Sequence, residues 1–303
     1  MKSSVNFNSA GLKLAGNLYL PERPVGGQLA AIVVSHPGSG VKEQAADLYA
    51  RRLSALGFAA LTFDAAYQGE SEGEPRGLED PNHRVEDIKA AVSYLSTLEQ
   101  VDSTKVGVLG ICASGGYAIS AAAADHRIRA VAAVSGVDIA AQFRNGADGT
   151  QSPAIIQAML DGAAKARTEE AQGKGMGSFP IFPASEKDAR AAGMHVFEGW
   201  QYYCTDRAQH PRSTKGFTWN SVDLMASFDA FRFIAMISPR PLLLIVGTHA
   251  VTSWMTTNAF IAAREPKEVF WVEGATHVSL YDHDEHVSAA VAKLQIYFND
   301  HLT

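Results

Sequence analysis

The 303-residue chain is poor in cysteine and contains no long hydrophobic run. Its two cysteines cannot form a disulfide framework, and no segment approaches the roughly 18 consecutive apolar residues that cross a bilayer. Residues 1–8 lack the apolar core of a secretory signal peptide. These absences predict a cytoplasmic protein that keeps its thiols reduced and does not associate with a membrane.

Basic tracts, internal repeats and low-complexity segments are also absent from the sequence. The net charge is −6, from 26 basic and 32 acidic residues, and no cluster of Lys or Arg stands out. A protein that binds nucleic acid is expected to carry such a cluster. We therefore expect a small-molecule ligand rather than nucleic acid. The sequence leaves open whether the chain forms a homodimer.

Short apolar segments alternate with helical patterns toward both ends of the chain. The composition is 47% hydrophobic, which is enough for a large core. Strands that alternate with helices form a mostly parallel sheet covered on both faces, so the pattern predicts an α/β fold with a doubly wound sheet of about eight strands. Besides an N-terminal hairpin, the segments that predict strands are residues 30–35, 58–63, 106–110, 130–135, 241–246 and 269–272.

The alternation stops between residues 138 and 237, where no core strand is evident. This segment has helical patterns at residues 155–171 and 186–207 and many aromatic side chains. We expect a helical cap inserted above the carboxyl edge of the sheet. Residues 1–137 and 238–303 then form one core.

The strongest chemical signal lies at residues 106–116, which read Val-Gly-Val-Leu-Gly-Ile-Cys-Ala-Ser-Gly-Gly. A nucleophile elbow needs small residues two positions before and after the nucleophile, because the backbone folds tightly past that side chain. Gly110 and Ser114 hold these positions around Cys112, so we expect Cys112 to be the nucleophile. The alternatives are a register in which Ser114 is the nucleophile, and a buried, inert cysteine.

The loop after the last expected strand carries a histidine. His277 ends the sequence Glu-Gly-Ala-Thr-His. In a doubly wound sheet, residues that do chemistry lie in the loops at the carboxyl ends of the strands. We expect His277 to be the general base and acid, within hydrogen-bonding reach of the Cys112 sulfur. His36 is the rival base.

The loop at residues 35–40 reads Ser-His-Pro-Gly-Ser-Gly. A glycine-rich turn lets backbone amides approach a substrate oxygen closely. We therefore assign an oxyanion hole to the backbone amides of Gly38 and Ala113. Further candidate contacts with the substrate, from this loop and the loop after residues 58–63, are His36, Tyr67 and Glu70.

Together these motifs resemble those of the α/β-hydrolases in the dienelactone-hydrolase-like and polyketide-transferase-like group. The resemblance implies the α/β-hydrolase fold, a small-molecule acyl substrate, and hydrolysis or acyl transfer from an ester, lactone or thioester without a metal or organic cofactor. Dienelactone hydrolases use a cysteine in a Gly-x-Cys-x-Gly-Gly elbow. Cys112 matches this pattern, with Ser114 in place of the first glycine after the cysteine. The matching stretches are residues 35–44, 63–71, 110–116 and 274–278.

The sequence departs from this group at the third member of the expected triad. Similar hydrolases carry an aspartate in a stretch resembling Gly-Thr-His-Ala-Asp-Thr, whereas residues 247–252 read Gly-Thr-His-Ala-Val-Thr. Val251 cannot accept the second N–H of the histidine. Asp138, which follows the strand beside the nucleophile's strand, is the best substitute. It fits the N-cap of a helix beginning at Ile139 at least as well.

A thiol tolerates the loss of this acid better than a hydroxyl does. Cysteine can ionise beside an imidazolium and a helix N-terminus before the substrate arrives. The expected mechanism is therefore attack by the Cys112 thiolate, followed by protonation of the leaving group by His277. Two other interpretations remain open. One is a non-catalytic protein that binds a small ligand, and the other is an inactivated variant in which Val251 replaced an aspartate.

Overall fold

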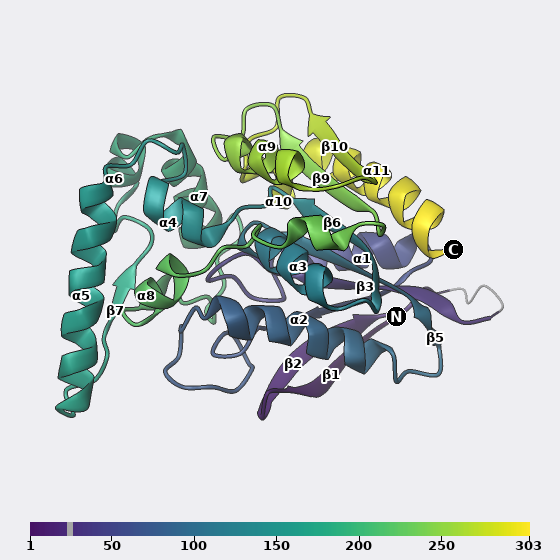
Figure 1. Cartoon of the computed structure of the whole chain (residues 1–303), viewed down its shortest axis with the longest axis horizontal. Coiled ribbons are helices and arrows are strands. Elements are labelled where there is room, and N and C mark those ends of the chain that lie inside the picture. Colours follow the sequence, from purple (N-terminus) through teal and green to yellow (C-terminus); the bar gives the residue numbers. More distant parts are fainter. Residues whose placement is uncertain (23–26) are drawn as a thin grey trace.

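An eight-stranded sheet forms the centre of the structure, a computed structural model that describes residues 1–22 and 27–303 (Figure 1). The strand order is β1-β2-β4-β3-β5-β6-β9-β10. β1 pairs antiparallel with β2 and β2 with β4, and the other neighbouring strands are parallel. The predicted α/β fold with a doubly wound sheet is thereby confirmed. The strands are β1 (Lys2–Ser9), β2 (Leu12–Tyr19), β3 (Leu29–Ser35), β4 (Ala59–Phe63), β5 (Val101–Ile111), β6 (Ile128–Val134), β9 (Leu242–Gly247) and β10 (Lys267–Val272).

Helices cover both faces of this sheet because its strands alternate side chains between two cores. Along β3, Val33 packs in one core and Ile32 in the other. In β5, Val108 and Leu109 divide in the same way. Strands buried on both faces are apolar throughout, so they read as continuous apolar runs in the sequence. The first core is covered by α2 (Pro81–Leu95), α3 (Ala113–Ala124) and α9 (Ser253–Ala262), and the second by α1 (Ala45–Ala55), α10 (Ser279–Asp282) and α11 (Asp284–Leu302).

Residues 138–237, which we call the cap, connect β6 to β9; helices α4 to α8 of this segment lie at one end of the molecule, on the left of Figure 1, and its last residues return to the core beside α3. The cap contains a two-stranded antiparallel sheet in which Phe179 pairs with Phe217. Each of these strands has three residues, too short to show a period in the sequence. The elements of the cap are α4 (Ile139–Asn145), α5 (Pro153–Ala171), β7 (Ser178–Pro180), α6 (Glu186–Ala191), α7 (Met194–Cys204), β8 (Gly216–Thr218), α8 (Ser221–Ala226) and the 3-10 helix η1 (Ile234–Ile237).

The helical pattern at residues 186–207 forms two helices rather than one. α6 ends before Gly193, and α7 begins after it. Gly193 has a φ of 102°, a conformation that glycine adopts readily and other residues do not. The break turns α7 so that it faces the carboxyl edge of the main sheet, where several of its side chains line a cavity.

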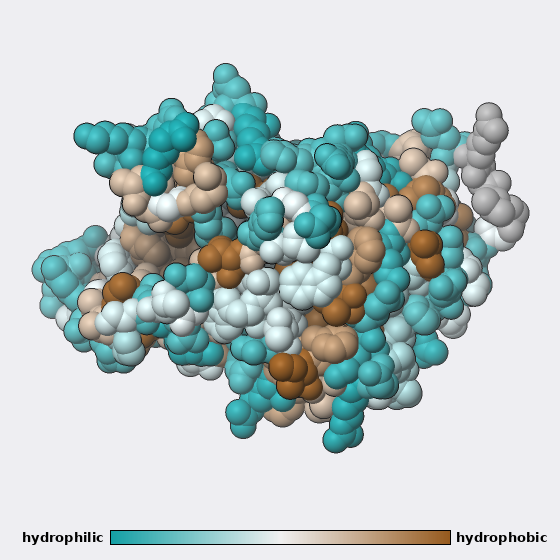
Figure 2. Space-filling view, turned by 90° about the horizontal axis from the view of Figure 1, so that it is seen from above, coloured by the Kyte–Doolittle hydropathy of each residue, from teal (hydrophilic) through white to brown (hydrophobic). Residues whose placement is uncertain are grey.

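On the face shown in Figure 2, hydrophilic side chains are interspersed with hydrophobic ones, which also lie across the middle and right of the view. Figure 2 shows a hollow on the left of the molecule in which hydrophobic side chains are visible between hydrophilic rims. Within residues 1–22 and 27–303, no helix has the length and apolar character required to cross a membrane.

Candidate active site

Cys112 lies at the sharp turn between β5 and α3. Its backbone has φ 57° and ψ −122°, a strained conformation for a residue with a side chain. Three backbone hydrogen bonds hold it there: its amide donates to Val134 O at 3.0 Å, and its carbonyl accepts from Gly115 N and Val137 N. The turn requires glycine at position 110, because a Cβ there would lie 2.0 Å from the carbonyl oxygen of Ser114. The sequence pattern therefore forms the predicted elbow.

Ser114, the alternative nucleophile, is buried beneath the elbow. Its hydroxyl donates to the carbonyl oxygen of His36 at 2.5 Å and accepts from Arg84 Nη2 at 2.7 Å. It also lies 2.9 Å from the hydroxyl of Ser35. These contacts turn Ser114 into the core, so Cys112 is the residue of the elbow that presents its side chain to the cavity.

Two backbone amides lower the pKa of the Cys112 thiol, against the larger effect of burial. They belong to Gly38 in the loop after β3 and to Ala113 at the start of α3. Arg84 ties these two segments together, since its guanidinium donates both to the carbonyl oxygen of His36 and to Ser114. These are the two residues for which the sequence predicts an oxyanion hole, and both lie beside the sulfur at the cavity.

His277 is buried in the loop after β10, and both of its ring nitrogens have partners. Nδ1 lies 2.7 Å from the hydroxyl of Thr252, and Nε2 lies 2.9 Å from the hydroxyl of Tyr281. Tyr281 also acts on the pKa of the Cys112 thiol, which it lowers against the larger effect of burial, so the two side chains are neighbours. Hydrogen bonds thus join Thr252, His277 and Tyr281, and Cys112 lies beside Tyr281. We expected His277 to reach the thiol directly, but its Nε2 is hydrogen-bonded to Tyr281.

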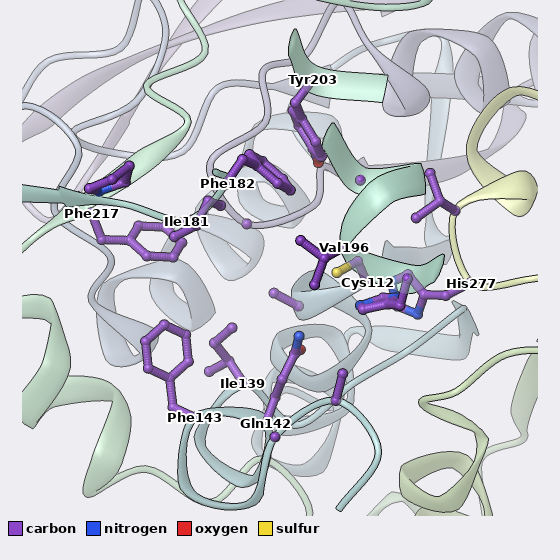
Figure 3. Close-up of a pocket in the computed structure, with 18 of the residues that line it drawn as sticks. Cys112, Ile139, Gln142, Phe143, Ile181, Phe182, Val196, Tyr203, Phe217 and His277 are labelled. Carbon is purple, nitrogen blue, oxygen red and sulfur yellow. The ribbon is translucent and has the colours of Figure 1, made fainter. Parts of the chain in front are cut away.

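A cavity of about 410 Å³ lies between these residues and the cap (Figure 3). The core side contributes Gly38, Cys112, Ala113, His277 and Tyr281. No Asp, Glu, Lys or Arg lines the cavity in the part of the chain that the structure describes. The cap side is mostly apolar and aromatic. Its side chains include Ile139, Gln142, Phe143, Phe179, Ile181, Phe182, His195, Val196, Tyr203 and Phe217.

The sequence matches the Dienelactone hydrolase family over residues 14–171. The chain belongs to the dienelactone hydrolase family. It is 37% identical to protein YcjY of Escherichia coli over 99% of this chain and 98% of that protein. It is 34% identical to protein PA2218 of Pseudomonas aeruginosa over 97% of this chain and 79% of that protein.

The crystal structure of PA2218 matches with a TM-score of 0.92 at 32% identity, covering 100% of this chain and 94% of that one. Thiohydrolase aneE of Aspergillus aculeatus is 38% identical over 47% of this chain and 43% of that protein. Family, relatives and fold together make this dienelactone hydrolase family member an α/β-hydrolase enzyme of the hydrolase and acyltransferase type.

Burial keeps the thiol and the imidazole of this family member uncharged. It lowers the pKa of His277 well below 6.5, and the neighbouring His195 lowers it further. Burial also raises the pKa of the Cys112 thiol above 9.0. Near pH 7 the thiol is therefore protonated and the imidazole neutral. The expected thiolate–imidazolium pair is not the resting state, because burial outweighs the contacts that lower the pKa of the thiol and the nearby Glu79 raises it further.

Asp138 does not orient His277, contrary to our prediction. Its carboxylate caps α4, where it accepts from Ala140 N at 2.9 Å, as the alternative reading of the sequence has it. Free N–H groups at a helix start attract such a side chain. Thr252 contacts the imidazole instead. It follows Val251, whose side chain is 38% exposed, whereas Thr252 is buried. Thr252 is part of the sequence motif around Val251. Nothing in the sequence predicts, however, that a threonine next to the missing aspartate contacts the histidine.

His36 is neither a base nor a substrate contact. It is fully buried, its Nδ1 lies 2.7 Å from its neighbour's carbonyl oxygen at Pro37, and its Nε2 accepts from Ala65 N at 3.1 Å. The ring therefore fastens the loop after β3 to the loop after β4. Burial holds the pKa of His36 well below 6.5, which suits this acceptor role.

Tyr67 and Glu70 also lie outside the cavity, so the prediction that they contact substrate is wrong for the pocket seen here. Tyr67 packs edge-on against His83, with ring centroids 5.2 Å apart. Glu70 forms ion pairs with Lys42 at 2.6 Å and Arg212 at 3.3 Å. Both residues brace the loops around them. Tyr281 is a site residue that sequence reasoning missed, although it follows His277 by one helical turn.

Proposed function

We propose that this family member cleaves an ester, lactone or thioester through an acyl-enzyme on Cys112. The observation that carries the proposal is that two backbone amides, from Gly38 and Ala113, lie beside one sulfur, next to a tyrosine hydroxyl that is hydrogen-bonded to His277. Such a site combines a nucleophile, a base and an oxyanion hole around one point, which is what acyl transfer requires.

The proposed reaction begins with a proton transfer that accompanies attack. As the Cys112 sulfur bonds to the acyl carbon, its proton passes to Tyr281, and Tyr281 gives its own proton to Nε2 of His277. The carbonyl oxygen becomes an oxyanion that accepts hydrogen bonds from the two amides. Collapse of this intermediate breaks the bond to the leaving oxygen or sulfur, which takes the proton from His277 by the same path.

Water, or an acceptor alcohol or thiol, then releases the acyl group. Its oxygen or sulfur bonds to the acyl carbon while its proton moves to His277, and the carbon–sulfur bond to Cys112 breaks as the thiol regains a proton. Hydrolysis and acyl transfer differ only in this acceptor. Thr252 supports both steps, because an acceptor at Nδ1 leaves Nε2 with the lone pair that takes the proton.

Trapping of the acyl-enzyme tests this proposal. The protein is incubated with a p-nitrophenyl ester, the release of nitrophenolate is followed, and the modified peptide is identified by mass spectrometry. We expect a burst of nitrophenolate and an acyl group on Cys112. Cys204, the second thiol, is the matched control, because it lies on α7 in the cap and its substitution with Ser should not change the burst.

Two results would contradict the proposal. An adduct on Ser114 would shift the nucleophile by two residues. Tight binding of the ester without any adduct or turnover would favour the alternative, a protein that binds a small ligand without cleaving it.

A further inference from the structure

Three polar side chains of the cap, Gln142, His195 and Tyr203, line the cavity without a hydrogen-bond partner among the described residues. Gln142 and His195 carry the nitrogen and oxygen atoms that matter here, and Gln142 is the first. It lies on α4, and its side chain points into the cavity toward Cys112 (Figure 3). Its Oε1 is buried and accepts no hydrogen bond in the described structure. A buried polar atom without a partner is unfavourable, and such atoms are rare in native proteins. An explanation is therefore needed for an amide at this position.

His195, on α7, is the second. It lines the same cavity, and its ring packs edge-on against His277 with centroids 5.2 Å apart. Burial lowers the pKa of His195 below 6.5, so the ring is neutral near pH 7 and offers one donor and one acceptor. Within residues 1–22 and 27–303 its side chain makes no hydrogen bond, whereas both ring nitrogens of His277 are occupied.

The remaining lining restricts the charge of a ligand. No acidic or basic side chain borders the cavity in the described residues. A carboxylate or phosphate placed there would lose its hydration without gaining an ionic partner, which is strongly unfavourable. A neutral hydroxyl or ketone, in contrast, can pair with a carboxamide and a neutral imidazole.

We propose that Gln142 and His195 bind a neutral hydroxyl or ketone oxygen of the substrate, close to the scissile carbonyl, and that the rest of the group in the cavity is apolar and uncharged. The oxygen lies close to the scissile carbonyl because His195 is in contact with His277. This inference rests on the proposed acyl-enzyme function and names the substrate class of the same site. The oxygen belongs either to the acyl chain or to the leaving group, and both carry the same chemistry.

Matched substrates test the inference. Three thioesters of N-acetylcysteamine share one chain length and differ in one group: hexanoyl, β-hydroxyhexanoyl and adipoyl, which ends in a carboxylate. Two further esters, the propyl and hydroxyethyl esters of hexanoic acid, place the hydroxyl on the leaving group. We expect kcat/KM for one of the hydroxylated substrates to exceed that of its plain partner by about ten- to a hundredfold. Adipoyl should be the poorest acyl group.

Variants of the two side chains separate recognition from catalysis. Gln142→Leu and His195→Phe keep the bulk and remove the hydrogen-bonding atoms. Each should reduce the ratio between the hydroxylated and the plain substrate toward one. Gln172→Leu is the matched control, because Gln172 is exposed at the end of α5 outside the cavity and the ratio should stay at its wild-type value.

The outcomes are distinguishable. A preference for the hydroxylated thioester that is lost in Gln142→Leu or His195→Phe places the oxygen on the acyl chain. The same result for the hydroxyethyl ester places it on the leaving group. A wild-type ratio near one in both pairs, a preference for adipoyl, or a ratio unchanged in both variants would overturn the inference. If Cys112 is acylated by all these substrates without selectivity, the proposed function stands and only this inference fails. If no substrate acylates Cys112, the proposed function itself fails.

Discussion

The two walls of the cavity are built in different ways. On the core wall, each reacting group is held by its neighbours: Cys112 by backbone hydrogen bonds, and His277 by Thr252 and Tyr281. On the cap wall, the polar groups of Gln142 and His195 have no partner within the described residues. Under the proposed function, the comparison teaches that the groups for bond cleavage are already held in place before substrate binds, whereas the groups proposed for recognition gain their partners only from the substrate.

The packing of the two regions differs in the same direction. β3 and β5 bury nearly every apolar side chain in one of the two cores. α5 of the cap, in contrast, buries only Ile156, Ala163 and Ala166 among its 19 residues. Segments with few buried contacts open at lower free energy than a core. The region that selects the ligand is therefore the one better able to adjust to it.

Removal of the thiol should have the largest effect. We expect Cys112→Ala to reduce kcat/KM on the order of ten-thousand-fold or more, because no other group can form the acyl-enzyme. Cys204→Ala, in the cap, should stay within about twofold, since that thiol does not line the cavity. Steady-state kinetics on a p-nitrophenyl ester measure both. Comparable losses of kcat/KM in the two variants would contradict the assignment of catalysis to the core wall.

Thr252 tests how much the core wall depends on a neutral orienting group. Thr252→Val keeps the shape of the side chain and leaves the buried N–H of His277 without an acceptor. Such an unpaired group costs about 1–3 kcal/mol, which corresponds to a loss of roughly ten- to a hundredfold in kcat/KM. Thr252→Ser should restore most of the activity because it returns the hydroxyl. Equal activity in the valine and serine variants would show that Thr252 serves packing alone.

The sequence predicts the core wall well and the cap wall poorly. The elbow around Cys112, the amide of Gly38 and the position of His277 follow from backbone requirements, since small residues are needed where the chain turns sharply. Thr252 and Tyr281 are visible only once β9 and α10 meet, because neither residue type marks a catalytic loop. Gln142 lies in a cap whose helices carry no recurring motif.

Asp138 illustrates the same limit from the other direction. Asp138 follows β6, the strand next to the nucleophile's strand β5. An aspartate at this position can be either a helix cap or a triad acid. Sequence position alone does not separate them. The structure does so through the direction of the carboxylate, which points to Ala140 N.

The dependence of activity on pH should reflect the neutral state of the core wall. His277, with its pKa well below 6.5, remains a base down to acidic pH, and Cys112, with its pKa above 9.0, remains a thiol up to basic pH. We therefore expect kcat/KM to be nearly flat from pH 6.5 to 9, and to fall only at pH values well below 6.5 or above 9. A resting pair of Cys112 thiolate and His277 imidazolium, in which the thiol has the lower pKa and the imidazole the higher one, gives a similar profile. Iodoacetamide distinguishes them, because a resting thiolate at Cys112 would be alkylated rapidly at pH 6, and we expect slow alkylation instead.

The smallest effect is expected at Asp138, on the boundary between the two regions. Burial raises the pKa of this carboxyl, so its ionised form is less favourable in the folded protein than in the unfolded chain. Its contribution to stability is therefore largest below the unfolded pKa near 3.8 and is lost as the pH rises. Asn caps a helix as well as Asp and carries no charge. Asp138→Asn should thus be at least as stable as the wild type at pH 7 and retain its kcat/KM, whereas Asp138→Ala should lose about 1 kcal/mol of unfolding free energy with the cap. Thermal unfolding and ester turnover, measured on both variants, decide the matter: abolished turnover in Asp138→Asn would restore this residue as the triad acid and move part of the catalytic apparatus to the cap.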